Sequence, residues 1–532
     1  MRRFAELLDR LVLTPSRNGK LTLLVDYFAT TPDPDRGLAL AALTGDLDIP
    51  SVKPAMLRTL VMERIDPVLF GYSYDYVGDL AETISLVWPE TLQEEERHDP
   101  RLSEVVAILQ RAGRAEGPRI FADLLDRLDI PARFALIKLA TGGLRIGVSA
   151  RLAKQALADL GDKEANEIEE LWHGLKPPYL SLFAWLEGRA EKPASAALAM
   201  FRPVMLAHPV EDRDLEVADP ADYAAEWKWD GIRVQATGEG GVRRLYSRTG
   251  DDVAPAFPDL IEAMDFEASL DGELLVGAPS ATGSFSDLQQ RLNRKTVSTK
   301  LAARFPAFMR CYDLLQVGDE DLRPLPFAKR RARLEALMAL LDPERFDLSP
   351  LVPFETWEEL NARRMAPPHP VIEGVMLKRH DSVYVPGRPK GPWFKWKRDP
   401  FTVDAVLMYA QRGHGKRSSF YSDYTFGVWA GDGTAPELVP VGKAYFGFTD
   451  EELRQIDKYV RDNTIERFGP VRSVRADMKS GLVLEIAFEG LNRSTRHKSG
   501  VAMRFPRISR LRWDKPTAEA DRLETLQALL PD

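Results

Sequence analysis

The stretch Glu226-Trp227-Lys228-Trp229-Asp230-Gly231-Ile232-Arg233 carries more chemical information than any other part of the sequence. If it forms a β-strand, side chains alternate, and Glu226, Lys228 and Asp230 lie on one face. Placing a lysine between two carboxylates and beside two tryptophans costs free energy unless the group acts on a ligand. The alternative is a surface ion-pair ladder flanked by two core tryptophans. A K-x-D-G tetrapeptide occurs by chance in about one of eight chains of this length, so its meaning depends on the rest of the sequence.

Length and composition are typical of a soluble globular protein. The 532 residues predict about three domains, because domains usually run to about 100–200 residues. No run of about 18 apolar residues is present, and the N-terminus meets charges at once, so we expect neither a membrane span nor a secretory signal. The single cysteine, Cys311, excludes a disulfide framework and a four-cysteine zinc site and favours a reducing, cytoplasmic setting.

Positive charge is concentrated in two segments, although the whole chain has a net charge of −8. Residues 378–417 contain ten Lys/Arg and three Asp, and residues 493–515 contain eight Lys/Arg and one Asp. Phosphate binding requires cations clustered on one face rather than a basic total. A solvated surface would also explain either segment, but both are interleaved with Trp, Phe and Gly, which a solubilising run does not need.

The pattern of apolar residues divides the chain into three regions. Residues 1–195 show Leu and Ala at three- and four-residue spacing, which predicts an all-α domain. A polar stretch of small residues at 191–197 is a candidate linker. Residues 200–398 alternate helical runs with strand-like runs, such as 225–229, 232–237 and 243–247, which predicts an α+β domain. Residues 399–532 are mostly strand-like with one helix opened by a capping box at Thr449 and Glu452, which favours a small β-barrel of the OB type.

A glycine pair, Gly142-Gly143, interrupts the helical region just before Arg145. One interpretation is an ordinary helix C-cap followed by a turn, because glycine adopts the required backbone conformation without strain. The other is a contact with a DNA phosphate through the exposed amides near Arg145. The local pattern by itself favours the C-cap interpretation.

The stretch from Glu226 to Arg233 resembles motif I of the covalent nucleotidyltransferases. This superfamily comprises ATP- and NAD-dependent DNA ligases, RNA ligases and mRNA capping enzymes. Segments similar to the later motifs follow in the same order along the chain. They are Ser247-Arg248-Thr249-Gly250, Leu270-Asp271-Gly272-Glu273-Leu274 (motif III), Cys311-Tyr312-Asp313-Leu314 (motif IIIa), Glu373-Gly374-Val375-Met376-Leu377-Lys378 (motif IV), Trp393-Phe394-Lys395-Trp396-Lys397 (motif V), and Arg504-Phe505-Pro506-Arg507 through Arg512-Trp513-Asp514-Lys515 (motif VI).

This resemblance implies that Lys228 is the nucleophile and carries AMP as a covalent phosphoramidate. A protonated lysine is a poor nucleophile, so its pKa must be lowered by neighbouring cations or by desolvation. Lys378, Lys395, Lys397 and a bound metal ion are expected to supply that positive field. The α-phosphate of ATP must also be held in line with the amine while pyrophosphate leaves.

The same resemblance gives roles to further residues. Mg²⁺ prefers oxygen ligands and keeps several waters, so one or two carboxylates suffice, and Glu273 and Glu373 are the candidates. The expected nucleotide-binding residues are Glu226 on the adenine or ribose side, Arg233 and Arg248 on the sugar and phosphates, Glu273, Tyr312 stacked on the purine, Arg388, and the motif lysines Lys378, Lys395 and Lys397.

Two of these positions depart from the family pattern. Tyr312 stands where relatives usually have Phe, and stacking survives that change because both rings present a π-face. Relatives place an arginine six residues before Lys395, where this chain has Pro389. We assign that role to Arg388, reached by a one-residue insertion.

Motif VI lies in the expected barrel domain, which in the family swings over the nucleotide and then swings away so that DNA can enter. Arg507, Asp514 and Lys515 are its expected working residues. Arg398-Asp399-Pro400 lies at the domain boundary and is either a hinge or an ordinary linker.

The segment Arg412-Gly413-His414-Gly415-Lys416-Arg417-Ser418 superficially resembles a Walker A sequence. Its first glycine is misplaced, and Arg417 stands where Ser or Thr should follow the lysine. We therefore expect a basic loop near DNA, with Arg417 as a DNA-binding residue, rather than an ATP site.

Within the superfamily, the chain is most similar to the bacterial three-domain ATP-dependent DNA ligases. An NAD-dependent ligase needs four zinc-binding cysteines, a capping enzyme uses GTP and usually lacks a large helical domain, and an RNA ligase is typically smaller. The resemblance implies that ATP and Mg²⁺ are used to seal 5′-phosphate/3′-hydroxyl nicks in duplex DNA, in repair, replication or recombination. It implies a monomer whose three domains encircle DNA and grip its phosphates without reading sequence. Two alternatives stay open: a non-catalytic DNA clamp that keeps the ligase shape, and an enzyme that acts on RNA ends.

Overall fold

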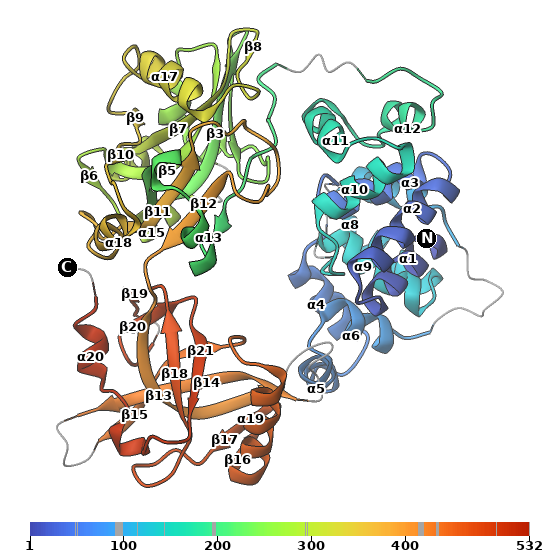
Figure 1. Cartoon of the computed structure of the whole chain (residues 1–532). Helices are drawn as coiled ribbons and strands as arrows, with labels where there is room; N and C mark the ends of the chain where they lie inside the picture. Colours follow the sequence, from blue (N-terminus) through green and yellow to red (C-terminus); the bar gives the residue numbers. More distant parts are fainter. Residues whose placement is uncertain are drawn as a thin grey trace.

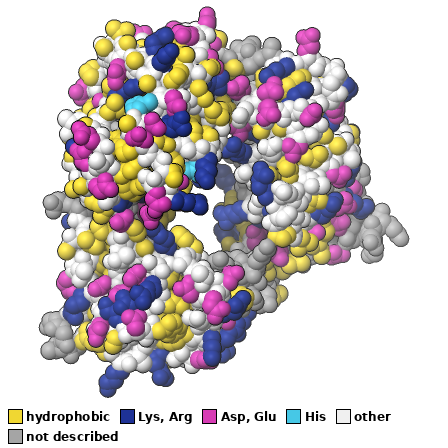
Figure 2. All heavy atoms as spheres, in the orientation of Figure 1, with side chains coloured by type: hydrophobic (Ala, Val, Ile, Leu, Met, Phe, Trp, Pro, Cys, Tyr) yellow, Lys and Arg dark blue, Asp and Glu magenta, His cyan; other side chains and the backbone are white. Residues whose placement is uncertain are grey.

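The computed structural model describes residues 1–47, 49, 52–90, 99–113, 115–142, 144–193, 198–292, 294, 296–412, 420–431, 436–495 and 497–530. They form a helical lobe, an α+β lobe and a β-rich lobe, in that order along the chain (Figure 1), which confirms the expected fold class. Figure 2 shows an opening between the lobes, with Lys and Arg side chains gathered along it. No described helix has the length and apolar character needed to cross a membrane. Arg417, predicted to contact DNA, lies outside the described residues.

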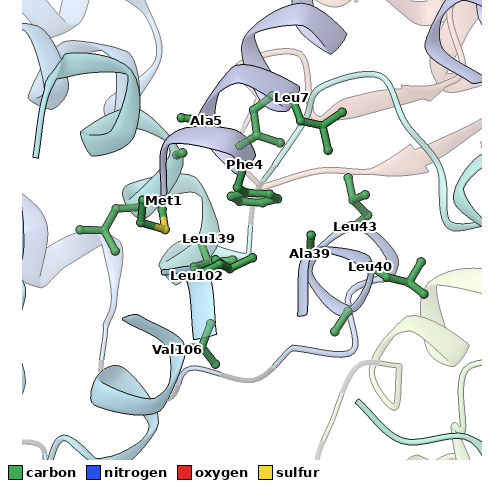
Figure 3. Close-up of a cluster of buried hydrophobic side chains, with 14 of the residues drawn as sticks. Met1, Phe4, Ala5, Leu7, Ala39, Leu40, Leu43, Leu102, Val106 and Leu139 are labelled. Atoms are coloured by element: carbon green, nitrogen blue, oxygen red, sulfur yellow. The ribbon is translucent and has the colours of Figure 1, made fainter. Parts of the chain in front are cut away.

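The helical lobe is built around one apolar core. In its first helix, Phe4, Leu7, Leu8 and Leu11 recur at helical spacing, and all four are buried. Figure 3 shows Phe4 among side chains from three other helices, α3, α7 and α9. The helices are α1 Arg2–Leu13, α2 Arg17–Thr30, α3 Asp35–Thr44, α4 Pro54–Met62, α5 Pro67–Val77, α6 Leu80–Val87, α7 Leu102–Arg111, α8 Gly117–Arg127, α9 Ile130–Thr141, α10 Ala150–Gly161, α11 Ala165–Leu171 with the 3₁₀ turn η2 Trp172–Gly174, and α12 Leu180–Leu186.

The loop between α9 and α10 has the geometry of a helix C-cap. Gly142 follows the last residue of α9 with φ of 67°, in the left-handed conformation that glycine tolerates. The Lys20 ammonium donates a hydrogen bond to the Ile146 carbonyl oxygen (2.6 Å), and the Ser149 hydroxyl caps the start of α10. Arg145 is exposed with φ of 47°. The C-cap interpretation therefore describes the backbone, and the exposed Arg145 side chain stays available for the predicted phosphate contact.

The α+β lobe contains two sheets. The first has strand order β1-β12-β11-β2-β10, and the second has order β4-β3-β5-β7-β8 with β6 and β9 added at β5 and β7. Strands expected at 225–229, 232–237 and 243–247 correspond to β2, β3 and β4. The strands are β1 His208–Pro209, β2 Tyr223–Trp229, β3 Ile232–Glu239, β4 Val242–Ser247, β5 Ala268–Ala278, β6 Ala281–Thr282, β7 Ala307–Val317, β8 Glu320–Asp321, β9 Phe346–Leu348, β10 Leu351–Val352, β11 Ile372–Arg379 and β12 Trp393–Lys397.

Short helices cover these two sheets. They are α13 Asp212–Val217, α14 Pro258–Glu262, α15 Phe285–Gln289, α16 Thr299–Arg304, α17 Phe327–Met338 and α18 Trp357–Met365. Among them α17 packs against β7, and its side chains reach the interior of the lobe through the buried residues Arg330, Arg331 and Leu334.

The β-rich lobe is a curled antiparallel sheet of the OB-like kind. Its longest strand, β13, pairs with β14, β17 and β18 and carries two register shifts, which let the sheet curl. Helix α19 begins with the expected capping box, in which Thr449 and Glu452 exchange hydrogen bonds. The elements are β13 Phe401–Arg412, β14 Tyr421–Ala430, β15 Glu437–Ala444, α19 Asp450–Asn463, β16 Thr464–Phe468, β17 Val471–Val474, β18 Val483–Phe488, β19 Gly490–Arg493, β20 Val501–Arg504, β21 Arg507–Arg512 and α20 Leu523–Gln527.

Arg330 of α17 and Asp313 of β7 form a two-point ion pair in which both side chains are fully buried (Nε–Oδ1 2.8 Å, Nη2–Oδ2 3.0 Å). Removing one partner of a buried pair leaves an uncompensated charge and typically costs about 3–5 kcal/mol. We expect Arg330→Met to lower the free energy of unfolding of this lobe by that amount, measured by urea denaturation followed by tryptophan fluorescence. Arg333→Ala on the same helix removes only an exposed pair with Glu320 and should cost less than about 1 kcal/mol. Equal losses in the two variants would contradict this account.

Candidate active site

A cavity of about 970 Å³ is lined by residues from both sheets of the α+β lobe. Backbone pairing places Lys228 of β2 opposite Gly374 of β11, and Gly374 opposite Lys397 of β12. Because residues two apart share a face of a strand, one wall is formed by a single face of these three strands. Its side chains are Glu226 and Lys228 from β2, Met376 and Lys378 from β11, and Trp393, Lys395 and Lys397 from β12.

The second sheet and two loops complete the lining of the cavity. Arg233 comes from β3, Glu273 from β5 and Tyr312 from β7, while Arg248 lies in the turn after β4 and Arg388 in the loop before β12. The structure thus brings all ten residues expected to bind nucleotide or to act as nucleophile to one cavity: Glu226, Lys228, Arg233, Arg248, Glu273, Tyr312, Lys378, Arg388, Lys395 and Lys397.

Glu373 reaches Lys228 because of a β-bulge in β11. Ile372 pairs with Trp229 and Gly374 with Lys228, so Glu373 is an extra residue without a partner across the ladder. A bulge re-aims side chains, and the Lys228 ammonium donates a hydrogen bond to Glu373 Oε2 at 2.6 Å. Strand alternation alone would not place this carboxylate beside the lysine.

The expected lowering of the Lys228 pKa is wrong for this structure. Burial lowers the pKa of Lys228, but the negative charges of Glu373 and Glu273 outweigh burial and raise the pKa above its ordinary value. Lys378 does not supply the expected field because its ammonium is already paired with Glu226 (2.6 Å). Carboxylates, not cations, therefore dominate the immediate surroundings of the amine.

Glu273 is a partly buried carboxylate that lies close enough to Lys228 for their charges to interact. Burial raises the pKa of Glu273 to about 7, although the charges of Lys228 and Arg233 oppose that shift. In the part of the chain that the structure describes, no hydrogen bond or ion pair joins this carboxylate to another residue. A partly buried carboxylate with free oxygen atoms suits a hard divalent cation, which would stabilise its charged form.

Three cations of the cavity have neither an ion pair nor a hydrogen bond among the described residues. Among the described residues, the side chains of Arg248, Arg388 and Lys395 make no hydrogen bond or ion pair. Burial and repulsion by neighbouring cations lower the pKa of Arg248 and of Lys395. A cluster of uncompensated cations on a cavity wall has the charge that a polyanion such as a triphosphate requires.

The carboxylate of Glu226 is held between two cations inside the protein. Lys378 pairs with Oε2 at 2.6 Å, and Arg331 of α17 donates to Oε1 at 2.9 Å. Lys378 also donates to the Tyr312 carbonyl oxygen (3.1 Å) and lies 4.4 Å from the centre of the Tyr312 ring. An aromatic ring and an acceptor group thus lie together in one part of the cavity.

Arg233 is largely committed to contacts within the protein. Its guanidinium donates from Nε and Nη2 to the fully buried carboxylate of Asp271 (2.9 and 2.6 Å), from Nη1 to the Met205 carbonyl oxygen and from Nη2 to the Tyr384 hydroxyl. Of its five N–H donors, one on Nη1 stays free for a ligand. We therefore revise the expected role of Arg233, because it ties β3 to β5 and offers at most one hydrogen bond to a sugar or phosphate.

The β-rich lobe approaches the cavity through Arg504 rather than through the expected motif VI residues. Arg504 of β20 forms a two-point ion pair with Asp230, immediately after β2. Lys397 lies 3.5 Å from Glu489. The residues expected to work on the nucleotide pair inside their own lobe instead: Arg507 with Glu489, Asp514 with Arg512, and Lys515 with Asp404.

No role was expected for Arg504, Glu489 or Arg331 from the sequence. Arg504 opens the motif VI segment, and its position there is the one signal that could have pointed to it. Arg331 lies in a helix rich in Lys and Arg, where it is indistinguishable in the sequence from its solvent-exposed neighbours.

Known proteins resemble this chain along its whole length. Residues 204–397 match the family described as ATP dependent DNA ligase domain, and residues 417–515 match the ATP dependent DNA ligase C terminal region. A "Probable DNA ligase" of Koribacter versatilis is 31% identical, over 99% of this chain and 96% of its own length. The chain belongs to the ATP-dependent DNA ligases.

Other similarities of the ligase agree with this assignment. A "Probable DNA ligase" of Streptomyces coelicolor is 30% identical over 99% of this chain and 98% of its own length. The solved structure titled "Pmar-Lig_PreS3" superposes with a TM-score of 0.58 over 96% of this chain and 99% of its own, at 16% identity, which shows a shared fold. The ligase is therefore an enzyme that uses ATP and acts on DNA, and the alternative of a non-catalytic clamp loses its support.

Replacing Glu373 by Gln should lower the pKa of Lys228, because it removes the neighbouring charge that raises this pKa most. A lower pKa leaves more of the amine deprotonated at a given pH. In the protein alone, the rate at which Lys228 reacts with an acylating reagent should therefore begin to rise at lower pH in Glu373→Gln, measured by mass spectrometry of the peptide. Glu437→Gln, which removes only a surface partner of Lys498, should leave the profile unchanged. An unmoved profile in Glu373→Gln would contradict this explanation.

Arg504→Ala should loosen the contact between the β-rich lobe and the α+β lobe, because it removes the two-point ion pair with Asp230. We expect a larger radius of gyration in small-angle X-ray scattering at low salt, and a smaller difference from wild type at high salt, where such pairs are screened. Arg493→Ala is the matched control, since Arg493 is exposed on the strand paired with β20. Identical scattering of the Arg504 variant and the wild type would show that the pair does not hold the lobes together.

Proposed function

We propose that Lys228 is the nucleophile of this DNA ligase and carries AMP from ATP to a nick. The Lys228 amine attacks the α-phosphorus of ATP and loses a proton, so that a P–N bond forms while the P–O bond to pyrophosphate breaks. AMP then passes to the 5′-phosphate of the nick, which frees the amine. The 3′-hydroxyl finally attacks that phosphate, forms the phosphodiester and releases AMP.

The observation that carries this proposal is that Lys228 shares its cavity with three cations that have no ion pair or hydrogen bond among the described residues. Arg248, Arg388 and Lys395 supply positive charge where a triphosphate needs it. They would also stabilise the negative charge that accumulates on the leaving pyrophosphate. In addition, the carboxylates of Glu373 and Glu273 lie next to the Lys228 amine, and both are suited to binding a divalent cation.

Glu273 and Glu373 would hold Mg²⁺. The ion would offset the negative charge of these two carboxylates beside Lys228, and it would also bind phosphate oxygens. The free oxygen atoms of Glu273 and the raised pKa of its carboxyl fit this role. Glu373 is engaged with Lys228 in the structure, so a cation that binds Glu373 would weaken that pair and release the amine.

The remaining nucleotide contacts follow from the lining of the cavity. Tyr312 would stack on the purine, and Glu226 would accept a hydrogen bond on the adenine or ribose side, with Lys378 beside it. Arg233 would add one donor at the sugar or phosphates. Lys397, which lies between Glu373 and Glu489, connects this site to the β-rich lobe.

We infer that the DNA substrate is a nicked duplex held by the three lobes. The opening between the lobes, with Lys and Arg along it, supports this inference (Figure 2). Exposed Arg145 belongs to the helical lobe and is proposed to contact a phosphate, and the motif VI residues Arg507, Asp514 and Lys515 are proposed to act when the β-rich lobe changes position. Separate apolar cores support domain limits of 1–195, 200–398 and 399–532. The monomeric state and the cytoplasmic location stay predictions.

Lys228→Ala should abolish covalent labelling of the protein by α-³²P-ATP, because it removes the amine that lies beside both Glu373 and Glu273. Lys329→Ala, which alters an exposed lysine of α17, should label like the wild type. Labelling is read after denaturing electrophoresis. A labelled Lys228→Ala variant would place the nucleophile at another residue.

The sugar of the sealed strand distinguishes a DNA ligase from an enzyme that acts on RNA ends. Nicked duplexes with deoxyribonucleotide or ribonucleotide strands should be joined at different rates, with the all-DNA nick joined fastest. Preference for ribonucleotide strands would favour the alternative of an enzyme acting on RNA ends.

A further inference from the structure

Glu226 occupies an unusual electrostatic position for a group in a ligand-binding cavity. Its side chain is only 2% exposed, and each carboxylate oxygen already receives a charged donor. Burial raises the pKa of Glu226, whereas the charges of Lys378 and Arg331 oppose that shift. Without both cations, a carboxyl group buried to this extent would tend to hold a proton.

Arg331 reaches this carboxylate from outside the strands that form the cavity wall. It lies in α17, on the helical layer behind β7, and its side chain is 8% exposed. Nη1 donates to Glu226 Oε1 at 2.9 Å, while Nε donates to Glu335 Oε1 at 2.8 Å one turn further along the helix. The planar guanidinium is thereby fixed at two points, and it fixes one oxygen of Glu226 in turn.

The protonation state and the orientation of Glu226 decide which purines it tolerates. An ionised carboxylate only accepts hydrogen bonds, whereas a protonated carboxyl group also donates one. Adenine carries an amino donor at its 6-position, and hypoxanthine carries an oxo acceptor at the same place. An acceptor fixed near the base therefore favours adenine and opposes hypoxanthine, because two acceptors facing each other leave a buried polar group unpaired.

We propose that Arg331 is a positioning residue for base selection, which holds the Glu226 carboxylate as a fixed acceptor for the 6-amino group of the purine. This inference rests on the proposed nucleotide site and adds to it a residue that does not line the cavity. Arg331 acts through Glu226 and touches neither the nucleotide nor the reacting atoms. Replacing Arg331 removes the hydrogen bond to Glu226 Oε1 and leaves the ion pair between Lys378 and Glu226 Oε2 in place.

The test uses the full chain and single-turnover labelling with α-³²P-ATP and α-³²P-ITP, which differ in the group at the 6-position of the base and in the proton that hypoxanthine carries on N1. Arg331→Met should raise KM for ATP about tenfold, as expected for loss of a charge-assisted hydrogen bond, and leave kcat for adenylation within about twofold. The preference for ATP over ITP should fall about tenfold. Arg331→Lys should restore part of that preference, because a lysine ammonium can still donate to Oε1.

Controls separate a positioning role from a structural one. Arg333→Ala on the same helix removes an exposed ion pair with Glu320 and should keep the wild-type preference. In a Glu226→Gln background, Arg331→Met should cause little further loss of preference, since the group through which it acts has changed.

Two results would overturn the proposal. One is an Arg331→Met variant that keeps the wild-type ratio of ATP to ITP, whether or not its melting temperature or active fraction falls. The other is an effect of Arg331→Met that is as large in the Glu226→Gln background as in the wild type. Failure of the proposed nucleophile is distinguishable, because it would appear as labelling of Lys228→Ala and leave the ratio of ATP to ITP unaffected.

Discussion

The antiparallel register between β2 and β11 determines where the charged groups of the cavity lie. It sets Lys228 opposite Gly374, and β12 continues the same face with Lys397. A slip of one residue would turn that face away from the cavity. Gly374 also lets the strands meet, since a Cβ atom there would lie 2.2 Å from the Trp396 carbonyl oxygen. The extra residue just before it, Glu373, is turned toward the lysine by the bulge.

Charges in and around this cavity fall into two groups with different functions. Paired charges such as Arg233 with Asp271 hold the walls together and have little capacity left for a ligand. Unpaired charges such as Arg248 and Lys395 keep their capacity and repel one another, so an anionic ligand relieves that repulsion. Lys228 is intermediate between the two groups, because it is paired with Glu373 and both side chains are partly exposed. The division lets one cavity combine stable walls with charges that are free to bind a ligand.

Among the described residues, ion pairs and a few ring contacts, such as His173 against Tyr246, join the lobes, and no apolar core spans two of them. Arg504 meets Asp230, Lys397 meets Glu489, and Arg323 of the α+β lobe meets Glu170 of the helical lobe at 2.7 Å. Partly exposed pairs of this kind contribute little free energy each and break readily. Apolar clusters stabilise each lobe by itself. Such contacts would let the lobes change position, as the proposed role of motif VI requires.

The sequence by itself determined the three-part architecture and most of the cavity, because both depend on local pattern. Apolar spacing separates helical from strand-rich regions, and strand alternation places Glu226 beside Lys228 on one face. The order of the motifs named ten cavity residues and the family. Those signals are carried by consecutive residues, so they survive without knowledge of the fold.

Only the tertiary structure decided which of these charges are free and which are paired. It showed that Lys228 forms an ion pair with Glu373, that Arg233 forms one with Asp271, and that Arg331 forms one with Glu226. These contacts join residues 38 to 145 positions apart in the chain. Burial and distance set the pKa and the pairing of a charged group, and neither is a property of local sequence. The sequence therefore named the neighbours of Lys228, and the fold decided the direction in which they shift its pKa.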